Sequence, residues 1–309
     1  MSHHTLIESK QRASLRVSVV IPAKNEEDTI APIVNAIRRD LMNAEFALVD
    51  ELIVIDSNST DRTAAIARAS GAVVYSAREI HPELGNSAGK GEALWKAQFV
   101  VTGDVLVFID ADLTSFTSEY IVRLLAPLLT DQRIALVKSY YDRDLVTDDG
   151  SKAAQGGRVT ELTARPILTL WWPELANIAQ PLGGEWAIRR DVFEQLSIPR
   201  GYGIELAVLI DVCESLGIDA IAQVDLGVRA HRHQDLQALS AMAAEVLAAA
   251  ERRRTGRVHD PDLSIAHASR VRRDVELTWT RRAVNVSERP PFREYRSALN
   301  EAPAPRTQH

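Results

Sequence analysis

Short apolar runs alternate with longer segments of helical periodicity along the first half of the chain. The runs lie at 17–23, 51–56, 72–76 and 104–110, and they are rich in β-branched residues and too short to form helices. Between them, apolar residues recur at helical spacing, as they do in 26–41. Strands that alternate with helices, and that are apolar on both faces, predict a parallel sheet covered by helices.

The pattern loosens after residue 135, so the second half predicts fewer elements. We expect strands at 135–141 and 220–228, and an amphipathic, alanine-rich helix at 235–255. Residues 142–158 are polar and contain several glycines, which is typical of a flexible loop. Residues 287–309 are rich in proline and arginine, so we expect this end to lie on the surface or to fray.

Composition narrows the class of protein. The chain has 309 residues and a formal net charge of −6, which does not favour nonspecific binding to nucleic acid. Its single cysteine, Cys213, excludes an intrachain disulfide and fits a reducing compartment. The first residues lack the apolar core of a signal peptide, and no apolar stretch approaches the length of a membrane-spanning helix. We therefore expect a cytoplasmic protein that binds neither membranes nor nucleic acid.

Two carboxylates follow the apolar run 104–110, in the sequence Asp110-Ala111-Asp112. Alternate residues of an extended segment point the same way, so these carboxylates repel each other unless a cation lies between them. Oxygen ligands suit Mg²⁺ or Mn²⁺. The alternative is a strand end followed by a helix-capping turn. The apolar strand favours a functional site, because ligands bind at the carboxyl ends of such strands.

A lysine between two glycines, Gly89-Lys90-Gly91, precedes a predicted helix and suggests contact with a phosphate. The spacing of the glycines excludes the P-loop of an NTPase, and a flexible loop is the alternative. Glu205, like Glu185, follows a glycine-rich turn, which either lets the backbone approach a ligand or is simple turn chemistry. The basic run 229–233 offers metal and anion ligands, or is an exposed loop.

Taken in order, VSVVIPAKNEEDTI, IDSNSTDRT and FIDADL resemble the nucleotide-binding half of GT-A glycosyltransferases. The segments SAGKGEALW, GGRVTELTARP, QPLGGEWAIRR, GYGIELAVLIDV and DAIAQVDLGVRAHRH are similar to the retaining glucosyl-3-phosphoglycerate synthase family, and ERPP near the end also fits. The resemblance implies an α/β fold of the GT-A, Rossmann-like type, with a mostly parallel central sheet flanked by helices and a small helical C-terminal extension.

The resemblance also implies how the chain is divided. We expect a mobile arm at 1–16, a nucleotide-sugar-binding half at 17–134 and an acceptor-binding half of the same domain at 135–234. A helical extension and tail at 235–309 would follow, with a possible dimer contact on its alanine-rich helix.

The resemblance also implies which residues bind the sugar-nucleotide donor. The turn from Pro22 to Glu26 matches the family's nucleotide pocket, with Glu26 on the ribose, and Ser57 matches its uracil contact. Lys90 matches a lysine near the diphosphate and the acceptor. The residues implied at the donor are Pro22, Ala23, Lys24, Glu26, Ser57, Lys90, Asp110, Ala111, Leu182 and Glu205. Among them, Glu205, Lys90 and Asp110 are expected to act in catalysis.

The resemblance places a metal and the acceptor on other residues. Asp112 and His231 match ligands of Mg²⁺ or Mn²⁺. The residues that match contacts to the acceptor, 3-phosphoglycerate, are Gly157, Arg158, Thr160, Arg229 and His233. Three departures from the family pattern can shift substrate preference: Ala111 replaces an expected serine, His233 replaces an expected asparagine, and Lys24-Asn25 make the nucleotide turn more basic.

The expected reaction is retaining transfer of glucose from UDP-glucose to the 2-hydroxyl of 3-phosphoglycerate by a homodimer. Front-face departure and return is implied, whereas double displacement would need Glu205 as nucleophile. Mannosyl transfer from GDP-mannose and a non-catalytic nucleotide-sugar binder are the alternatives.

Overall fold

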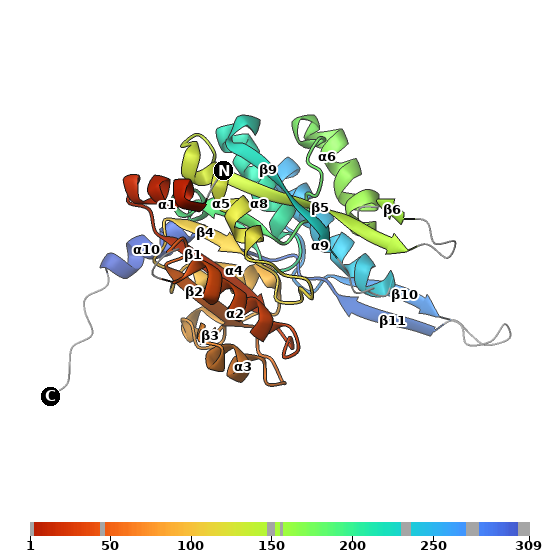
Figure 1. The fold of residues 1–309 in the computed structure, drawn as a ribbon. Coiled ribbons are helices and arrows are strands. Elements are labelled where there is room, and N and C mark those ends of the chain that lie inside the picture. The colour runs from red at the N-terminus through yellow and green to blue at the C-terminus, as the bar shows by residue number, and fades with distance from the viewer. Residues whose placement is uncertain are drawn as a thin grey trace.

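Among the described residues, a mixed sheet of eight strands forms the centre of the molecule (Figure 1). The structure, a computed structural model, describes residues 3–43, 47–146, 152–154, 157–229, 236–269 and 278–301. The strands lie in the order β3-β2-β1-β4-β7-β5-β6, and β9 pairs with β5. Their bounds are β1 Val17–Ala23, β2 Glu51–Asp56, β3 Val73–Ser76, β4 Val105–Phe108, β5 Leu136–Val146, β6 Lys152–Ala154, β7 Trp186–Arg189 and β9 Ile221–Arg229.

The first half of the sheet is parallel, as the alternation of strands and helices predicted. Strands β3, β2, β1 and β4 run in one direction, so their carboxyl ends meet at one edge. Strand β7 lies antiparallel between β4 and β5, and β5 pairs in parallel with β9. Ala23, Asp56 and the approach to Asp110 therefore share the edge at which a ligand is expected.

Helices cover both faces of the sheet, because the central strands β1, β2 and β4 are buried on both sides. Helices α1, α2 and α5 pack on one face, where α2 contributes Ile33, Val34 and Ile37 to the buried cluster. Helices α4 and α8 pack on the other face against Phe108 and Trp186. The helix bounds are α1 His3–Arg12, α2 Ile30–Leu41, α3 Thr63–Ala69, α4 Lys90–Ala97, α5 Glu119–Thr130, α6 Arg165–Trp171, α7 Arg190–Phe193 and α8 Ile204–Leu216.

Single helical turns fill several connections. Three are 3₁₀ turns: η1 Pro82–Leu84, η3 Pro173–Leu175 and η4 Ile218–Ala220. A π-helical turn, η2 Thr160–Ala164, runs directly into α6. Pro166 lies directly after this π-helical turn in a continuous helix, and a π-helical turn is one of the irregularities that can accommodate a residue without an N–H.

Three segments differ from the sequence-based expectation. The amino-terminal segment expected to be a mobile arm contains helix α1, whose Leu6 is buried and whose Lys10 forms an ion pair with Asp50. Helix α2 begins at Ile30 instead of residue 26, because 27–29 form a turn. The segment 142–158, expected to be a loop, carries the end of β5 and the short strand β6.

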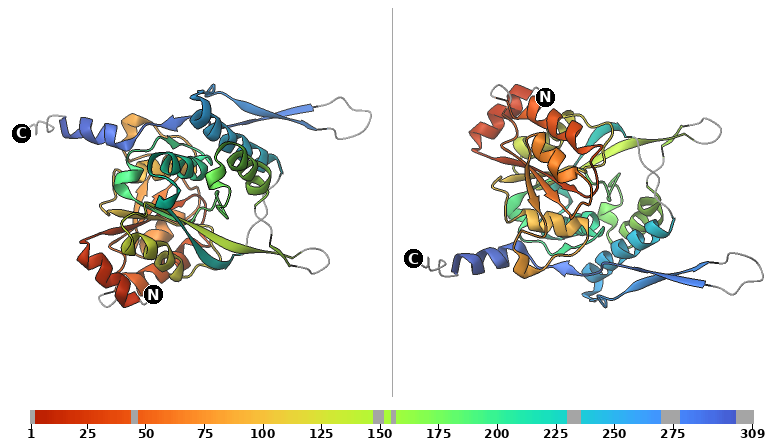
Figure 2. Two further views of the ribbon diagram at one scale, coloured as in Figure 1. Left: turned by 90° about the horizontal axis from the view of Figure 1, so that it is seen from above. Right: turned by 90° about the horizontal axis from the view of Figure 1, so that it is seen from below.

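The C-terminal extension is helical only in part. Helix α9, Leu236–Thr255, confirms the predicted helix. Strands β10 Ser264–Ser269 and β11 Thr278–Ala283 then form a hairpin, which projects from the body on the side away from helix α10, Phe292–Glu301 (Figure 2). Strand β12, Glu288–Arg289, pairs with β8, Ile198–Pro199, and helix α10 spans Phe292–Glu301. Residues 287–301 thus return to the body of the molecule.

Within the part of the chain that the structure describes, no helix has both the length and the apolar character needed to cross a bilayer.

Candidate active site

Lys90 lies between two carboxylates that the sequence had singled out separately. Its Nζ is 2.5 Å from Asp110 Oδ1 and 2.7 Å from Glu205 Oε1. The side chains of Lys90 and Glu205 are 15% and 5% exposed, so the three charges interact largely out of water. Burial by itself would lower the pKa of Lys90, but the two carboxylates outweigh burial and raise this pKa above its ordinary value. We call these three residues the Lys90 cluster.

Three elements of the fold bring the Lys90 cluster together. Lys90 is the first residue of α4, Asp110 follows the end of β4, and Glu205 lies in the first turn of α8. A carboxylate in the first turn of a helix is stabilised by the helix dipole. The cluster therefore joins the carboxyl end of a central strand to the amino ends of two helices that cover the same face.

Gly89 and Gly91 allow two chain segments to approach closely. A β-carbon on Gly91 would lie 1.8 Å from Pro199 O, and one on Gly89 would lie 2.2 Å from Arg200 O. Gly89 also has φ of +140°, which disfavours any other residue. The glycines beside Lys90 are thus accounted for by packing against the segment that leads into Glu205, and no phosphate is required to explain them.

Lys138 is a buried lysine of the site that the sequence analysis missed. It lies on β5 and donates from Nζ to Gly183 O at 2.6 Å. Its charged end also lies 5.9 Å from the centre of the Trp186 ring. Burial lowers the pKa of Lys138 to about 8, although the carboxylate of Glu205 acts in the opposite direction. Lys138 therefore holds the turn that contains Gly183, next to the half-buried Leu182.

The expected nucleotide turn forms one unit with the loop after β2. Ser57 N donates to Ala23 O at 2.8 Å, and Glu26 N donates to Thr63 Oγ1 at 2.8 Å. Asn25 has φ of 57° and its Oδ1 accepts a hydrogen bond from Thr60 N at 2.8 Å. Asparagine tolerates this left-handed conformation, so its presence in the turn has a structural reason. Pro22 is half-buried at the end of β1, and Lys24 is exposed.

Asp112 is exposed two residues beyond Asp110, and Ala111 between them is buried in an apolar cluster. An alanine suits that environment, because a serine hydroxyl there would need a hydrogen-bond partner. Among the described residues, no group of three or more histidine, cysteine, aspartate or glutamate side chains is arranged to hold a metal. The second predicted ligand, His231, lies outside the described residues. The Asp112 carboxylate itself is a hard oxygen ligand that fits Mg²⁺ or Mn²⁺.

The expected acceptor residues belong to other segments than those of the Lys90 cluster. Arg158 is exposed and Thr160 is buried at the start of η2, which packs against α9. Gly157, half-buried, precedes them. The backbone of Arg229 ends β9, and His233 lies outside the described residues. Their roles at the acceptor stay predictions.

A comparison with known protein families identifies the class of protein to which this chain belongs. Residues 18–197 match the family model described as glycosyl transferase family 2. Because this match spans more than half of the chain, the protein is a glycosyltransferase of this family.

Curated relatives and solved structures narrow the class. The glucosyl-3-phosphoglycerate synthase of Mycobacterium tuberculosis is 48% identical over 240 residues, which cover 77% of this chain and 73% of that protein. A crystal structure of the same organism's synthase with Mn²⁺, UDP-glucose and phosphoglyceric acid is 41% identical with a TM-score of 0.82, covering 96% of this chain and 95% of that one. Another, with Mg²⁺ and UDP, is 41% identical with a TM-score of 0.83, covering 96% of each chain. The chain belongs to glycosyl transferase family 2 and, within it, to the glucosyl-3-phosphoglycerate synthases.

Proposed function

We propose that this protein transfers glucose from UDP-glucose to the 2-hydroxyl of 3-phosphoglycerate with retention of configuration. The observation that carries the proposal is the Lys90 cluster, which lies at the carboxyl end of β4 beside the exposed Asp112. A half-buried cation and an exposed carboxylate at this edge suit a ligand whose negative charge grows as the sugar bond breaks. The M. tuberculosis synthase, which is similar over most of this chain, is described with this donor and with phosphoglyceric acid.

Different side chains would bind the donor and the acceptor. Asp110 and Glu205 hold the Lys90 amine in one place, from which it can donate to the diphosphate or to the acceptor. Asp112, together with His231, would hold Mg²⁺ or Mn²⁺, and the ion when bound would neutralise charge on the diphosphate. The two anionic groups of 3-phosphoglycerate would lie against Arg158, Arg229 and the N–H groups near Thr160. Fixing the acceptor hydroxyl near the anomeric carbon supplies much of the rate gain.

The ion pair of Glu205 favours front-face transfer over double displacement. A nucleophilic carboxylate needs an accessible lone pair, whereas Glu205 is 5% exposed and paired with Lys90 at 2.7 Å. We infer that Glu205 orients the lysine and the sugar hydroxyls. A departing phosphate oxygen then accepts the proton of the acceptor's 2-hydroxyl as the new bond forms.

A direct assay tests the proposed function. The purified protein is incubated with UDP-glucose, 3-phosphoglycerate and Mg²⁺, and the product is identified by mass spectrometry and its anomeric configuration by NMR. We expect a glucosylated phosphoglycerate with α configuration. GDP-mannose, supplied in competition, should be used poorly. Preferred mannosyl transfer would support the mannosyl alternative, and UDP binding without any transfer would support a non-catalytic binder.

Two other expectations remain predictions. The buried face of α9, including Val246 and Ala250, packs against α8 within the same chain, so this face does not itself call for a dimer. Light scattering in solution would decide between monomer and homodimer. Cell fractionation would test the cytoplasmic location that the single, buried Cys213 suggested.

A further inference from the structure

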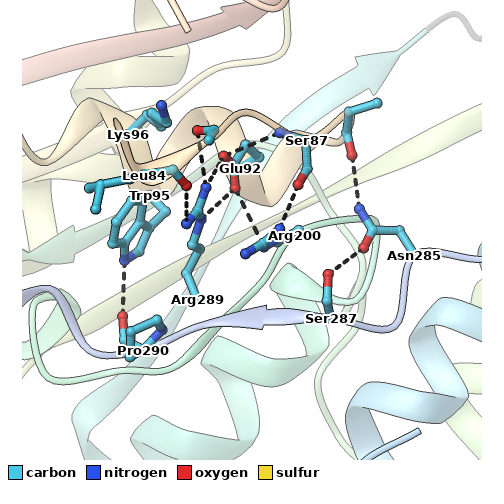
Figure 3. A network of polar contacts seen from close by, with 12 residues as sticks. Leu84, Ser87, Glu92, Trp95, Lys96, Arg200, Asn285, Ser287, Arg289 and Pro290 are labelled. Carbon is cyan, nitrogen blue, oxygen red and sulfur yellow. Dashed lines mark hydrogen bonds and ion pairs between the residues drawn. The ribbon is translucent and has the colours of Figure 1, made fainter. Parts of the chain in front are cut away.

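The C-terminal segment 285–290 crosses the two chain segments that lead into Lys90 and Glu205 (Figure 3). Asn285 Nδ2 donates to Ala88 O at 2.8 Å, two residues before Lys90. Arg200 N donates to Ser287 O at 3.0 Å, five residues before Glu205. The segment therefore contacts the entry to α4 and the entry to α8 at once.

Arg289 is the residue of this segment with the most polar contacts to the α4 entry. Its guanidinium binds the Glu92 carboxylate at two points, with Nε at 2.8 Å from Oε2 and Nη2 at 2.6 Å from Oε1. Nη1 also donates to Leu84 O at 2.9 Å, and the group lies 4.6 Å from the centre of the Trp95 ring. The side chains of Arg289 and Glu92 are 5% and 1% exposed. A planar, two-point contact of this kind fixes orientation as well as position.

Glu92 links this contact to the active site. It lies two residues after Lys90 in the first turn of α4, and residues two apart in a helix point to nearly opposite sides. Glu92 N also donates to Arg200 O at 2.9 Å. With Glu92 and the carbonyl of Leu84 both held by Arg289, the loop between them is fixed at its two ends. The Lys90 side chain is then directed toward Asp110.

We propose that Arg289 is a positioning residue for Lys90, through Glu92 and the carbonyls of the loop that precedes α4. The C-terminal segment is accordingly part of the architecture of the active site, although it lies beyond the matched transferase region, residues 18–197. The inference rests on the proposed function for its kinetic readout. Its structural half, the ordering of residues 84–92, is measurable without turnover.

A double-mutant cycle in the full-length protein tests the kinetic half. Arg289→Lys keeps the charge but loses the two-point contact. We expect kcat to fall about tenfold while the KM for UDP-glucose changes by less than about threefold, because Lys90 acts on charge that develops in the transition state. In a Lys90→Ala background, the same change should lower kcat by less than about twofold, since both substitutions act through one amine. Equal losses in the two backgrounds would overturn the proposal.

Hydrogen exchange, followed by mass spectrometry, tests the structural half. Arg289→Lys should speed amide exchange in residues 84–92 by at least about tenfold without changing exchange in β4. Unchanged exchange in 84–92 would overturn the proposal, even where Lys90→Ala leaves no measurable turnover. If the unmodified protein transfers no glucose to 3-phosphoglycerate, the proposed function fails, while the exchange result still decides the role of Arg289.

Arg189→Lys is the matched control. Arg189 also donates to backbone carbonyls, those of Leu128, Asp131 and Ile134, but it pairs with Val105 at the amino end of β4. We expect this control to lower Tm while leaving kcat and the exchange of 84–92 unchanged. If the control changes kcat and exchange as Arg289→Lys does, the effect is general loss of stability and the proposal is wrong.

Discussion

Gly184 packs directly against Asp110. A β-carbon built on Gly184 would lie 2.0 Å from Asp110 Oδ2 and 2.6 Å from Lys90 Nζ. Its φ lies outside the left-handed region, so the backbone conformation alone does not require glycine. The absence of a side chain at this position is therefore a condition for the ion pair between Lys90 and Asp110.

Gly184→Ala should displace the Asp110 carboxylate and the Lys90 amine while the backbone stays as it is. We expect kcat/KM to fall at least about tenfold, which corresponds to about 1.4 kcal/mol of transition-state stabilisation. Steady-state kinetics at matched folded concentration provides the measurement. Gly103→Ala is the control, because its β-carbon would lie 2.4 Å from Ser18 Oγ, at the amino end of β4. That control should lose stability and keep its kcat.

Glu205→Gln removes a charge and keeps the shape of the side chain. Lys90 retains Asp110 as a partner, so we expect turnover to fall about ten- to a hundredfold and to persist. Intact-mass spectrometry of the unsubstituted protein, mixed with UDP-glucose, should show no glucosyl adduct. A glucosyl adduct on residue 205 in the unsubstituted protein would instead establish double displacement.

Lys138 predicts a pH dependence of folding stability. Its pKa is about 8 in the folded protein against 10.5 for the ordinary group, so the unfolded chain binds more protons between these values. The free energy of unfolding that Lys138 contributes therefore rises from pH 8 to pH 10.5, by on the order of 3 kcal/mol, and is lost as the pH falls through 8. Denaturant titrations of the unsubstituted protein and of Lys138→Met across this range should differ by that slope.

Removal of divalent metal should abolish transfer. Treatment with a chelator is expected to lower activity below detection, and Mn²⁺ or Mg²⁺ should restore it. Asp112→Ala should lower kcat/KM at least about a hundredfold and weaken Mn²⁺ binding measured by calorimetry, because a carboxylate ligand is lost. Asp104 lies just before β4, at the opposite end of this strand from Asp112, so Asp104→Ala should change neither kcat/KM nor Mn²⁺ binding. Undiminished transfer by metal-free Asp112→Ala protein would refute the proposed role of the ion.

The strands and helices in the first half of the chain could be predicted because they follow from local sequence patterns. Residues 51–56 were predicted as a strand and are β2, since a short apolar run rich in β-branched residues favours a strand buried on both faces. Helix α1 was missed because only Leu6 and Lys10 are buried, which is too short a pattern to show periodicity. The C-terminal hairpin was missed because every residue of β11 is exposed and gives no apolar alternation.

Site residues next to the end of a strand or the start of a helix could be predicted from the sequence. Those whose role depends on tertiary contacts were missed. Asp110 was predicted because it ends an apolar run, and Lys90 because it lies between two glycines before a helix. Lys138 is followed by Ser139 in an otherwise apolar predicted strand, so nothing local marks it, and only its hydrogen bond to the Gly183 carbonyl shows what it does. Arg289 gave a weaker signal, as part of a short motif near the end, because its partner Glu92 is far away along the chain.

Arg289 and Glu92 are separated by 197 positions, so their contact joins an early part of the polypeptide to one of the last parts to be synthesised. Folding on the ribosome proceeds from the amino terminus, and a buried carboxylate without its counter-charge is strongly destabilising. Before Arg289 is synthesised, Glu92 can pair with Arg200 at 3.8 Å, but the closer two-point contact of the α4 entry forms only when translation has nearly finished. A truncated product that stops before Arg289 would contain Lys90, both aspartates and Glu205, but would lack the side chain that we propose positions the lysine.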